Sequence, residues 1–178
     1  IKPSDIQRED FQKLKESKKT IVQKLKSQFR VKGWNEYVEF IDALLNSRLK
    51  KGNDFFHSQE YEFKMFESLE EMVEQIKKRD TESGLSRLIA GYSWPWISKN
   101  DKSLYDIVIE DFSLQWNSVS DDFINSENAI NEVGCIHTTQ WYDLNYSGII
   151  FGNEISYDPI SNQIIINERN YFDKNGKQ

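Results

Sequence analysis

Three short apolar runs constrain the fold of this chain most strongly. They lie in "GLSRLIAGYSW" (84–94), "VGCIH" (133–137) and "GIIFG" (148–152). Runs this short and this apolar are typical of strands that are covered on both faces, as in a parallel sheet. Because helical patterns accompany these runs along the chain, the sequence predicts an α/β fold with a mainly parallel sheet flanked by helices.

Two helices are predicted from apolar spacing. In "GWNEYVEFIDALLNSRLKKG" (33–52) apolar residues recur every three or four positions, and Gly52 can close the helix. Ser68 opens a capping box for a second helix. The apolar stripe of this second helix is Leu69, Met72, Val73 and Ile76. A weaker helical pattern covers residues 1–27, which we interpret as a helical lead-in to a main domain over residues 28–178.

The remaining segments are read from alternation and turn residues. "EFKMF" (62–66) and "YDIVIEDFSLQW" (105–116) each predict a strand, and the polar stretch "DDFINSENAINE" (121–132) is compatible with a helix. "EISYDPISNQIIIN" (154–167) contains two turn signals, Asp-Pro and Ser-Asn, between apolar runs. It predicts a C-terminal β-hairpin.

Composition limits the classes of function. The net charge is −6, which argues against a protein that grips nucleic acid by bulk charge, so any site for a polyanion must be local. The single cysteine excludes a disulfide framework and suggests a reducing compartment, so we expect a cytoplasmic protein. No run approaches the roughly 20 apolar residues that span a bilayer, so no membrane partner is expected. Since the chain begins at Ile1, we expect a piece of a longer protein.

Polar residues follow the central apolar run. His137, Thr138, Thr139 and Gln140 come directly after "VGCI". In open parallel sheets, ligands bind just outside the carboxyl ends of the strands. Hydroxyls, a carboxamide and backbone N–H groups at such an end suit a phosphate or a nucleotide. The alternative is that the two threonines cap a following helix and that the histidine belongs to the core.

Longer blocks of the sequence resemble a known family. "IHTTQWYDLNYSGIIFG" resembles motif V of superfamily 1 helicases, His-x-(Ser/Thr)-Gln-Gly-x-(Glu/Asp) followed by an apolar strand. Further blocks are similar to the Schlafen-group-3-like DNA/RNA helicase family, a bacterial domain of unknown function. These blocks are "LKSQFRVKGWNEYVEFIDALL", "SRLIAGYSWPW", "INSENAINEVG", "CIHTTQ", "YDLNY" and "EISYDPISNQIIINERNYFDKNGK". The resemblance covers nearly the whole chain from about Leu25 onward.

This resemblance implies the second RecA-like motor domain of a superfamily 1-type helicase, with a P-loop NTPase-type fold. Arg30 matches the motif IV arginine that reaches the γ-phosphate, and Gln28 would help to place the nucleotide. Asp143 matches the acidic residue that hydrogen-bonds the ribose. The positions that would contact the nucleic-acid backbone are His137, Thr138, Thr139 and Gln140. Alternatively, Arg30 is a surface ion-pair partner and Asp143 a first-turn helix residue placed by the dipole.

The sequence departs from the family pattern in two ways. Trp141 stands where motif V has glycine, so its ring must either fill the cleft or point away from it, and we expect it near the cleft. No Gly-x-x-x-x-Gly-Lys-(Ser/Thr) loop and no motif VI arginine segment is present in the chain. ATP and Mg²⁺ would therefore be held only in the full-length parent, with its first RecA-like domain.

Three hypotheses about function follow. The first is a C-terminal motor-domain fragment of a nucleic-acid-dependent ATPase or helicase, which contributes part of the ATP cleft and of the single-strand groove. Alone, this fragment would be inactive and bind single strands weakly. The second is a non-enzymatic nucleic-acid or protein interaction module derived from the helicase fold. The third is a nuclease, suggested by Asp106, Glu110 and Asp111, although the lysine expected two residues after the acidic pair is missing.

Overall fold

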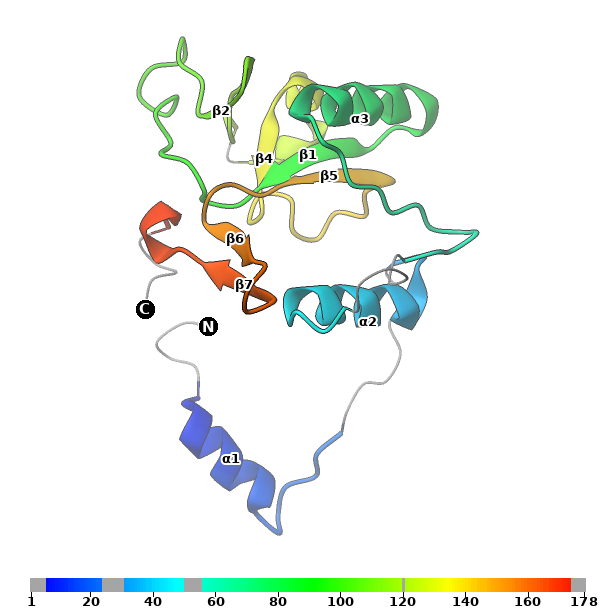
Figure 1. Cartoon of the computed structure of the whole chain (residues 1–178), viewed down its shortest axis with the longest axis vertical. Helices are drawn as coiled ribbons and strands as arrows, with labels where there is room; N and C mark the ends of the chain where they lie inside the picture. The colour runs from blue at the N-terminus through cyan, green and yellow to red at the C-terminus, as the bar shows by residue number, and fades with distance from the viewer. Residues whose placement is uncertain (1–5, 24–30, 50–55, 120, 174–178) are drawn as a thin grey trace.

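The computed structural model of the chain describes residues 6–23, 31–49, 56–119 and 121–173 (Figure 1). Its helices are α1 (Arg8–Glu16), α2 (Trp34–Leu45) and α3 (Leu69–Ser83). Its strands are β1 (Ser86–Ala90), β2 (Ile107–Ile109), β3 (Phe112–Leu114), β4 (Val133–Cys135), β5 (Tyr146–Ile150), β6 (Ile155–Asp158) and β7 (Gln163–Ile166). Three short 3-10 turns are η1 (Phe123–Asn125), η2 (Ala129–Asn131) and η3 (Glu168–Asn170).

The centre of the molecule is a parallel sheet of three strands in the order β4-β1-β5. Leu88 of β1 lies opposite Val133 of β4 on one side and Gly148 of β5 on the other. Trp116 forms a further parallel bridge with Val133, so a fourth segment continues the sheet beyond β4. The prediction of a mainly parallel sheet within an α/β fold is confirmed, as are its three strands.

Helix α3 covers one face of this sheet. Its N-terminus is capped as predicted, because the Ser68 hydroxyl accepts a hydrogen bond from the backbone N–H of Glu71 at 3.1 Å. Three residues of the predicted apolar stripe are buried: Leu69, Val73 and Ile76. At Gly148 in β5, an added Cβ atom would lie 2.8 Å from Leu88 Cδ2 and 3.1 Å from an Ile76 side-chain carbon. The absence of a side chain at this position therefore lets α3 approach the sheet closely.

The other face is covered by the segment that was predicted to be helical over residues 121–132. It forms the two 3-10 turns η1 and η2 instead, and it buries Phe123, Ile124 and Ala129 with Leu144 packed against them. Polar side chains bond locally here, since the Asn125 side chain donates to Asp122 at 2.8 Å. Such bonds compete with helical ones, which explains why the predicted helix does not form.

A buried arginine on β1 joins the elements on the two faces of the sheet. The Nε and Nη2 atoms of Arg87 donate to the carbonyl oxygen of Ile124 at 3.0 and 2.7 Å. Its Nη1 atom donates to Asp80 of α3 at 2.8 Å. The guanidinium therefore links η1 to the end of α3 beside the start of β1.

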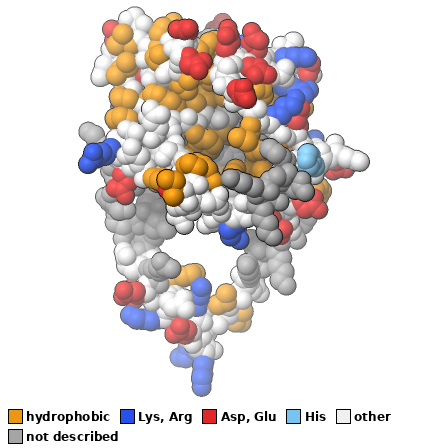
Figure 2. Space-filling model, viewed as in Figure 1, with side chains coloured by type: hydrophobic (Ala, Val, Ile, Leu, Met, Phe, Trp, Pro, Cys, Tyr) orange, Lys and Arg blue, Asp and Glu red, His pale blue; other side chains and the backbone are white. Residues whose placement is uncertain are grey.

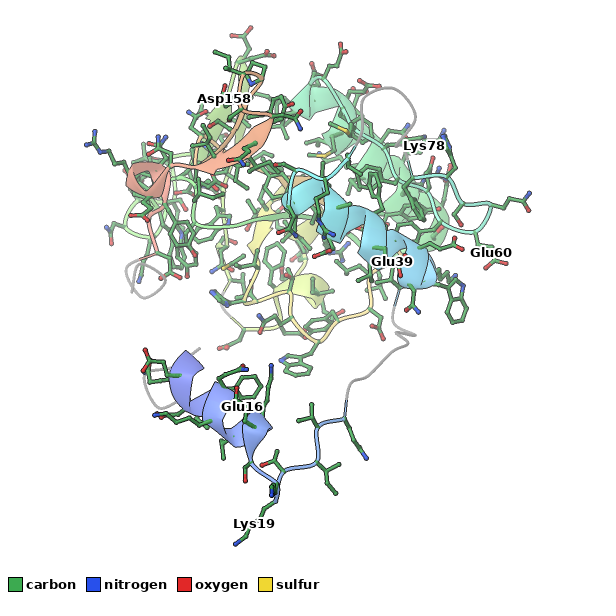
Figure 3. The ribbon with its side chains drawn as sticks, turned by 60° about the horizontal axis from the view of Figure 1, so that its bottom comes forward. Glu16, Lys19, Glu39, Glu60, Lys78 and Asp158 are labelled. Atoms are coloured by element: carbon green, nitrogen blue, oxygen red, sulfur yellow. The ribbon has the colours of Figure 1, made fainter. Side chains whose placement is uncertain are left out.

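Two antiparallel hairpins flank the sheet. The segment 105–116, predicted as one strand, folds back on itself as β2 and β3, with Glu110 in the left-handed backbone region at φ 53°. The C-terminal hairpin of β6 and β7 is confirmed, with Asp158 paired to Gln163. Asp158 lies at its turn and accepts hydrogen bonds from the backbone N–H of Ile160 at 2.9 Å and the hydroxyl of Ser161 at 2.6 Å (Figure 3). Hydrogen bonds from Ser161 and Ile160 lower the pKa of the Asp158 carboxyl.

The N-terminal part of the chain is less integrated with the sheet. Helix α1 ends at Glu16, well before residue 27, and it stands apart from the other elements in both ribbon views (Figures 1 and 3). Helix α2 forms as predicted but ends at Leu45 and buries none of its residues, while Gly52 lies outside the described residues. Residues 62–66 are not a strand, and no strand among the described residues pairs with them. The rings of Tyr37 and Phe40 contact Phe63 instead, at centroid distances of 6.2 and 5.1 Å.

Helices α1, α2 and α3 all fall short of the length and apolar character that crossing a bilayer requires, within the part of the chain that the structure describes.

Candidate functional site

The three parallel strands end together, and the loops that follow them meet. We call this the carboxyl edge, formed by residues 91–94 after β1, 136–143 after β4 and 151–154 after β5. The rings of Tyr92 and His137 lie 6.0 Å apart between the first two loops. At Gly152 an added Cβ atom would lie 2.7 Å from Ser93 Cβ and 2.8 Å from Glu154 Oε2, which joins the first and third loops.

The loop after β4 begins with a turn that its own threonines hold. The backbone N–H groups of Thr138 and Thr139 both donate to the carbonyl oxygen of Cys135 at 3.1 Å. The Thr139 hydroxyl donates to the same oxygen at 3.1 Å, and the Thr138 hydroxyl donates to Asn117 Oδ1 at 2.8 Å. No helix follows within residues 136–145, all of which are described, so the alternative that these threonines cap a helix is wrong.

Three side chains of the predicted set are exposed at this edge: His137, Gln140 and Asp143. His137 is therefore not a core histidine, and Asp143 is not a first-turn helix residue. Thr139, by contrast, is only 9% exposed. An exposed imidazole and an exposed carboxamide supply hydrogen-bond donors and acceptors, whereas the threonines act through the shape of the turn.

Trp141 has an unusual backbone conformation. Its φ angle is 75°, in the left-handed region that glycine adopts without strain, and its side chain is 84% exposed. The ring therefore lies on the surface rather than filling a cleft. Motif V has glycine at this position, and the backbone of Trp141 adopts the left-handed conformation that glycine favours.

The carboxyl edge also contains residues that the sequence did not predict as site residues, namely Tyr92, Ser93 and Glu154. Ser93 and Glu154 are 6% and 8% exposed. Their Oγ and Oε2 atoms have no hydrogen-bond partner among the residues that the structure describes. Burial and the neighbouring Cys135 thiol raise the pKa of Tyr92 to about 12. These residues could have been found by examining the end of every predicted strand, because ligand sites lie at that edge of the whole sheet.

Comparison with known proteins identifies the family. The model of the Schlafen group 3 DNA/RNA helicase domain matches residues 1–178, the whole chain. The chain belongs to this family. The resemblance predicted from the sequence blocks is confirmed, and with it a nucleic-acid helicase-related domain.

One curated relative of this helicase domain is "Uncharacterized protein YPL245W" of Saccharomyces cerevisiae, which is 30% identical over 167 residues. The match covers 85% of the chain and 37% of the relative, so the domain spans little more than a third of that protein. No solved structure matches the chain closely enough to be counted as similar.

Two residues predicted from the helicase family, Gln28 and Arg30, lie outside the described residues. Their roles beside the nucleotide remain predictions. Asp143 lies on the same loop as His137 and Gln140, and all three side chains are exposed there.

The acidic residues that suggested a nuclease have a structural explanation in this helicase domain. Asp106 is buried, and its two carboxylate oxygens accept hydrogen bonds from the backbone N–H groups of Ser98 and Trp116, each at 2.8 Å. Glu110 and Asp111 are exposed in the turn between β2 and β3. Within residues 6–23, 31–49, 56–119 and 121–173, no group of three or more His, Cys, Asp or Glu side chains could hold a metal ion.

Proposed function

We propose that the chain is the second motor domain of a nucleic-acid-dependent ATPase of helicase type. In this proposal the carboxyl edge forms part of the single-strand groove and one wall of the ATP cleft. The observation that carries it is the exposure of His137 and Gln140 on a turn at the end of β4 that two threonine side chains hold in place. Membership of the helicase-domain family supports the same conclusion.

The proposed turn would act by preorganisation. Thr138 and Thr139 use their hydroxyls to fix the loop, so the exposed carboxamide of Gln140 is offered to a nucleic-acid backbone at little entropic cost. His137 projects beside the Tyr92 ring, 6.0 Å away, which restricts the orientations of the imidazole. Asp143, exposed on the same loop, is proposed to accept a hydrogen bond from the ribose of the nucleotide.

The chemistry of hydrolysis would be shared between two domains. Because this sequence has no phosphate-binding loop, ATP and Mg²⁺ would be held by a first RecA-like domain of the parent protein. Arg30 would then stabilise the charge that develops on the transferred phosphoryl group, and Gln28 would help to place the nucleotide. The isolated chain is expected to have no ATPase activity.

Binding of single strands by this domain alone is expected to be weak. The net charge is −6, and Figure 2 shows acidic side chains gathered over the upper part of the face in view, with Lys and Arg in small separate groups. Since affinity for nucleic acid comes largely from phosphate contacts by basic residues, such a surface gives low affinity that falls further as salt rises.

The proposal can be tested by ATP hydrolysis in the full-length protein, with and without a single-stranded oligonucleotide. We expect Arg30→Ala to abolish hydrolysis, and we expect Gln140→Ala and His137→Ala to lose most of the stimulation by oligonucleotide while the basal rate remains. His57→Ala is the matched control, since His57 is the other histidine and is exposed in the segment before α3. ATP hydrolysis by the isolated chain that Arg30→Ala abolishes would contradict the division between two domains.

A second candidate is a non-enzymatic interaction module that keeps the helicase fold. The acidic net charge favours it, because it weakens the case for a motor that tracks along a polyanion. A full-length protein that neither binds nor hydrolyses ATP would support this second candidate over the first.

A further inference from the structure

We propose that a polar cavity at the amino end of β4 binds a nucleobase with an exocyclic amino group, and that Glu132 accepts a hydrogen bond from that group. This inference rests on the proposed function, because the base would belong to the single strand that the domain binds. It goes beyond that function because Glu132 directly precedes β4, at the opposite end of the strand from the carboxyl edge.

The cavity lies where three segments of the chain meet, and its volume is about 300 Å³. This volume is at the lower end of the range for small-molecule sites, which suits one base better than a longer stretch of a strand. The segments are residues 102–105, between β1 and β2, residues 113–115, at the end of β3, and residues 128–132, around η2. The wall is mainly polar and includes Lys102, Tyr105, Gln115, Asn128, Asn131 and Glu132.

Glu132 brings a buried and incompletely bonded carboxylate to this wall. The residue is only 5% exposed. Its Oε1 atom accepts a hydrogen bond from Asn128 Nδ2 at 2.7 Å, and its Oε2 atom has no partner among the residues that the structure describes. Buried polar atoms are nearly always hydrogen-bonded, because an unpaired carboxylate oxygen away from water is costly. A ligand in the cavity can supply the missing donor.

Gln115 adds a second acceptor whose orientation is fixed. Its Nε2 atom donates to the carbonyl oxygens of Lys102 and Leu104 at 2.6 and 3.0 Å. Both hydrogens of this amide are therefore used, and only its oxygen remains for a ligand. The backbone N–H of Val133 donates to the carbonyl oxygen of Gln115 at 3.0 Å, which holds the segments of Gln115 and Glu132 together. These two side chains offer acceptors, so the ligand must bring donors.

Two other residues of the wall favour a nucleotide as the ligand. Tyr105 is 53% exposed, and an aromatic face of this kind stacks on a base. Lys102, whose Nζ atom donates to the carbonyl oxygen of Ser118 at 3.2 Å, places a positive charge in the wall for a phosphate of the strand. A cationic side chain of a partner protein would also bring donors, but Lys102 repels it.

The acceptors select among the bases. Cytosine, adenine and guanine carry an exocyclic amino group, and a carboxylate accepts a hydrogen bond from the amino group of cytosine. Thymine has a carbonyl oxygen at the corresponding position, which would place an acceptor against an acceptor. We therefore expect the cavity to favour cytosine over thymine.

The test is a fluorescence anisotropy titration of the full-length protein with fluorescein-labelled oligodeoxycytidylate and oligothymidylate of equal length. The wild type should bind the cytidylate about 5- to 100-fold more tightly, the range for one well-placed contact to a base. Glu132→Gln keeps the shape of the side chain and an oxygen for Asn128, but it puts an N–H donor in place of the unpartnered oxygen. The preference for cytidylate should then disappear or reverse, because this donor suits the thymine carbonyl.

Glu127→Gln is the matched control. Glu127 is exposed in the same segment, outside the cavity wall, and the substitution removes the same charge. It should leave the ratio of the two affinities unchanged. Lys102→Ala should weaken both oligonucleotides alike and lower the slope of affinity against salt by about 1, as the loss of one phosphate contact does.

A thermal melt separates a change of preference from a loss of fold. Glu132→Gln should not lower the melting temperature, because it replaces a buried charge that has a single hydrogen bond by a neutral group of the same shape. The preference of the folded wild type is itself a test that needs no variant.

The outcomes distinguish this inference from the proposed function. Equal binding of the two oligonucleotides by the wild type, or an unchanged preference in Glu132→Gln, would overturn the base site and leave the proposed function standing. A preference that Glu127→Gln alters as much as Glu132→Gln would also overturn it, since charge alone would then explain the effect. If the wild type binds neither oligonucleotide, both proposals fail.

Discussion

Helices α2 and α3 both carry apolar side chains at helical spacing, yet only α3 buries them. Leu69, Val73 and Ile76 of α3 pack against the sheet, whereas α2, which is richer in apolar residues, has no buried residue. The difference lies in what each helix faces. A parallel sheet offers α3 a continuous apolar surface with a glycine at the point of contact, and α2 meets mainly the rings of a neighbouring loop.

This comparison separates helix formation from helix burial. An amphipathic pattern is a local property and predicts that a helix forms, but burial also requires a complementary surface from elsewhere in the chain. The stability of the domain should therefore depend on the region from α3 to β5 far more than on α1 and α2.

The largest expected effect comes from truncating the core under α3. Leu88→Ala should lower the free energy of unfolding by about 3 kcal/mol, because Leu88 is 1% exposed and the cavity would lie between α3 and the sheet. Leu45→Ala in α2 should cost no more than about 0.5 kcal/mol, since Leu45 is 57% exposed. Urea denaturation measures both, and equal losses would show that α2 is as important to the fold as α3.

The next largest effect is expected from the loss of a buried arginine on β1, compared with an exposed arginine after α2. Arg87→Ala should lower the free energy of unfolding by about 2–3 kcal/mol, because it leaves the carbonyl oxygen of Ile124 without its buried donor and removes one of the two donors to the Asp80 carboxylate. Arg48 follows α2 and forms an exposed ion pair with Asp42 of that helix. Arg48→Ala should lower the free energy of unfolding by less than about 1 kcal/mol. A loss at Arg48 as large as that at Arg87 would contradict the contrast between the two regions.

A smaller effect concerns the helix caps. Ser68→Ala should destabilise the domain by about 1 kcal/mol, since it removes the hydrogen bond to the Glu71 N–H at the start of α3. Helix α1 has no side-chain cap at Gln7, whose backbone is extended as an N-cap requires. Gln7→Asp should therefore raise the helical content measured by circular dichroism without changing the unfolding midpoint. A shifted midpoint would mean that α1 is coupled to the sheet.

The smallest expected effect is a pH dependence of stability that comes from Tyr142, in the loop beside Trp141. The hydrogen bond to Asp122 raises the pKa of the Tyr142 phenol. A group whose pKa is higher in the folded state contributes stability below its unfolded pKa, about 10, and loses it as the pH rises through the folded value. The melting temperature should therefore fall slightly more between pH 9 and 11 in the wild type than in Tyr142→Phe. Identical slopes would rule out this contribution.

Several parts of the fold followed from local sequence. The N-cap at Ser68, the apolar strands β1, β4 and β5, and the two turn signals of the C-terminal hairpin each act over a few residues, and each is confirmed. Predictions failed where pairing decided the outcome. Residues 62–66 alternate like a strand but pair with no strand in the described part of the chain, and residues 105–116 pair with themselves as a hairpin.

Part of the candidate site was also predictable from local sequence, and part depended on tertiary contacts. The polar residues after the "VGCI" run were enough to predict that His137 and Gln140 stand at the end of a parallel strand, because strand period and strand-end chemistry are local. The use of the Thr138 and Thr139 hydroxyls within the turn depends on Asn117 and on a backbone carbonyl, and the meeting of Ser93, Gly152 and Glu154 depends on the order of the strands.

By itself, the sequence determined the family, the parallel sheet and the position of the motif at a strand end, since each is encoded in contiguous residues. Only the tertiary structure decided that α2 stays unburied, that the segment 121–132 forms 3-10 turns, and that the Trp141 ring lies on the surface. The burial of a helix depends on the surface that distant parts of the chain offer to it, and the 3-10 turns depend on local side-chain hydrogen bonds that compete with helical ones.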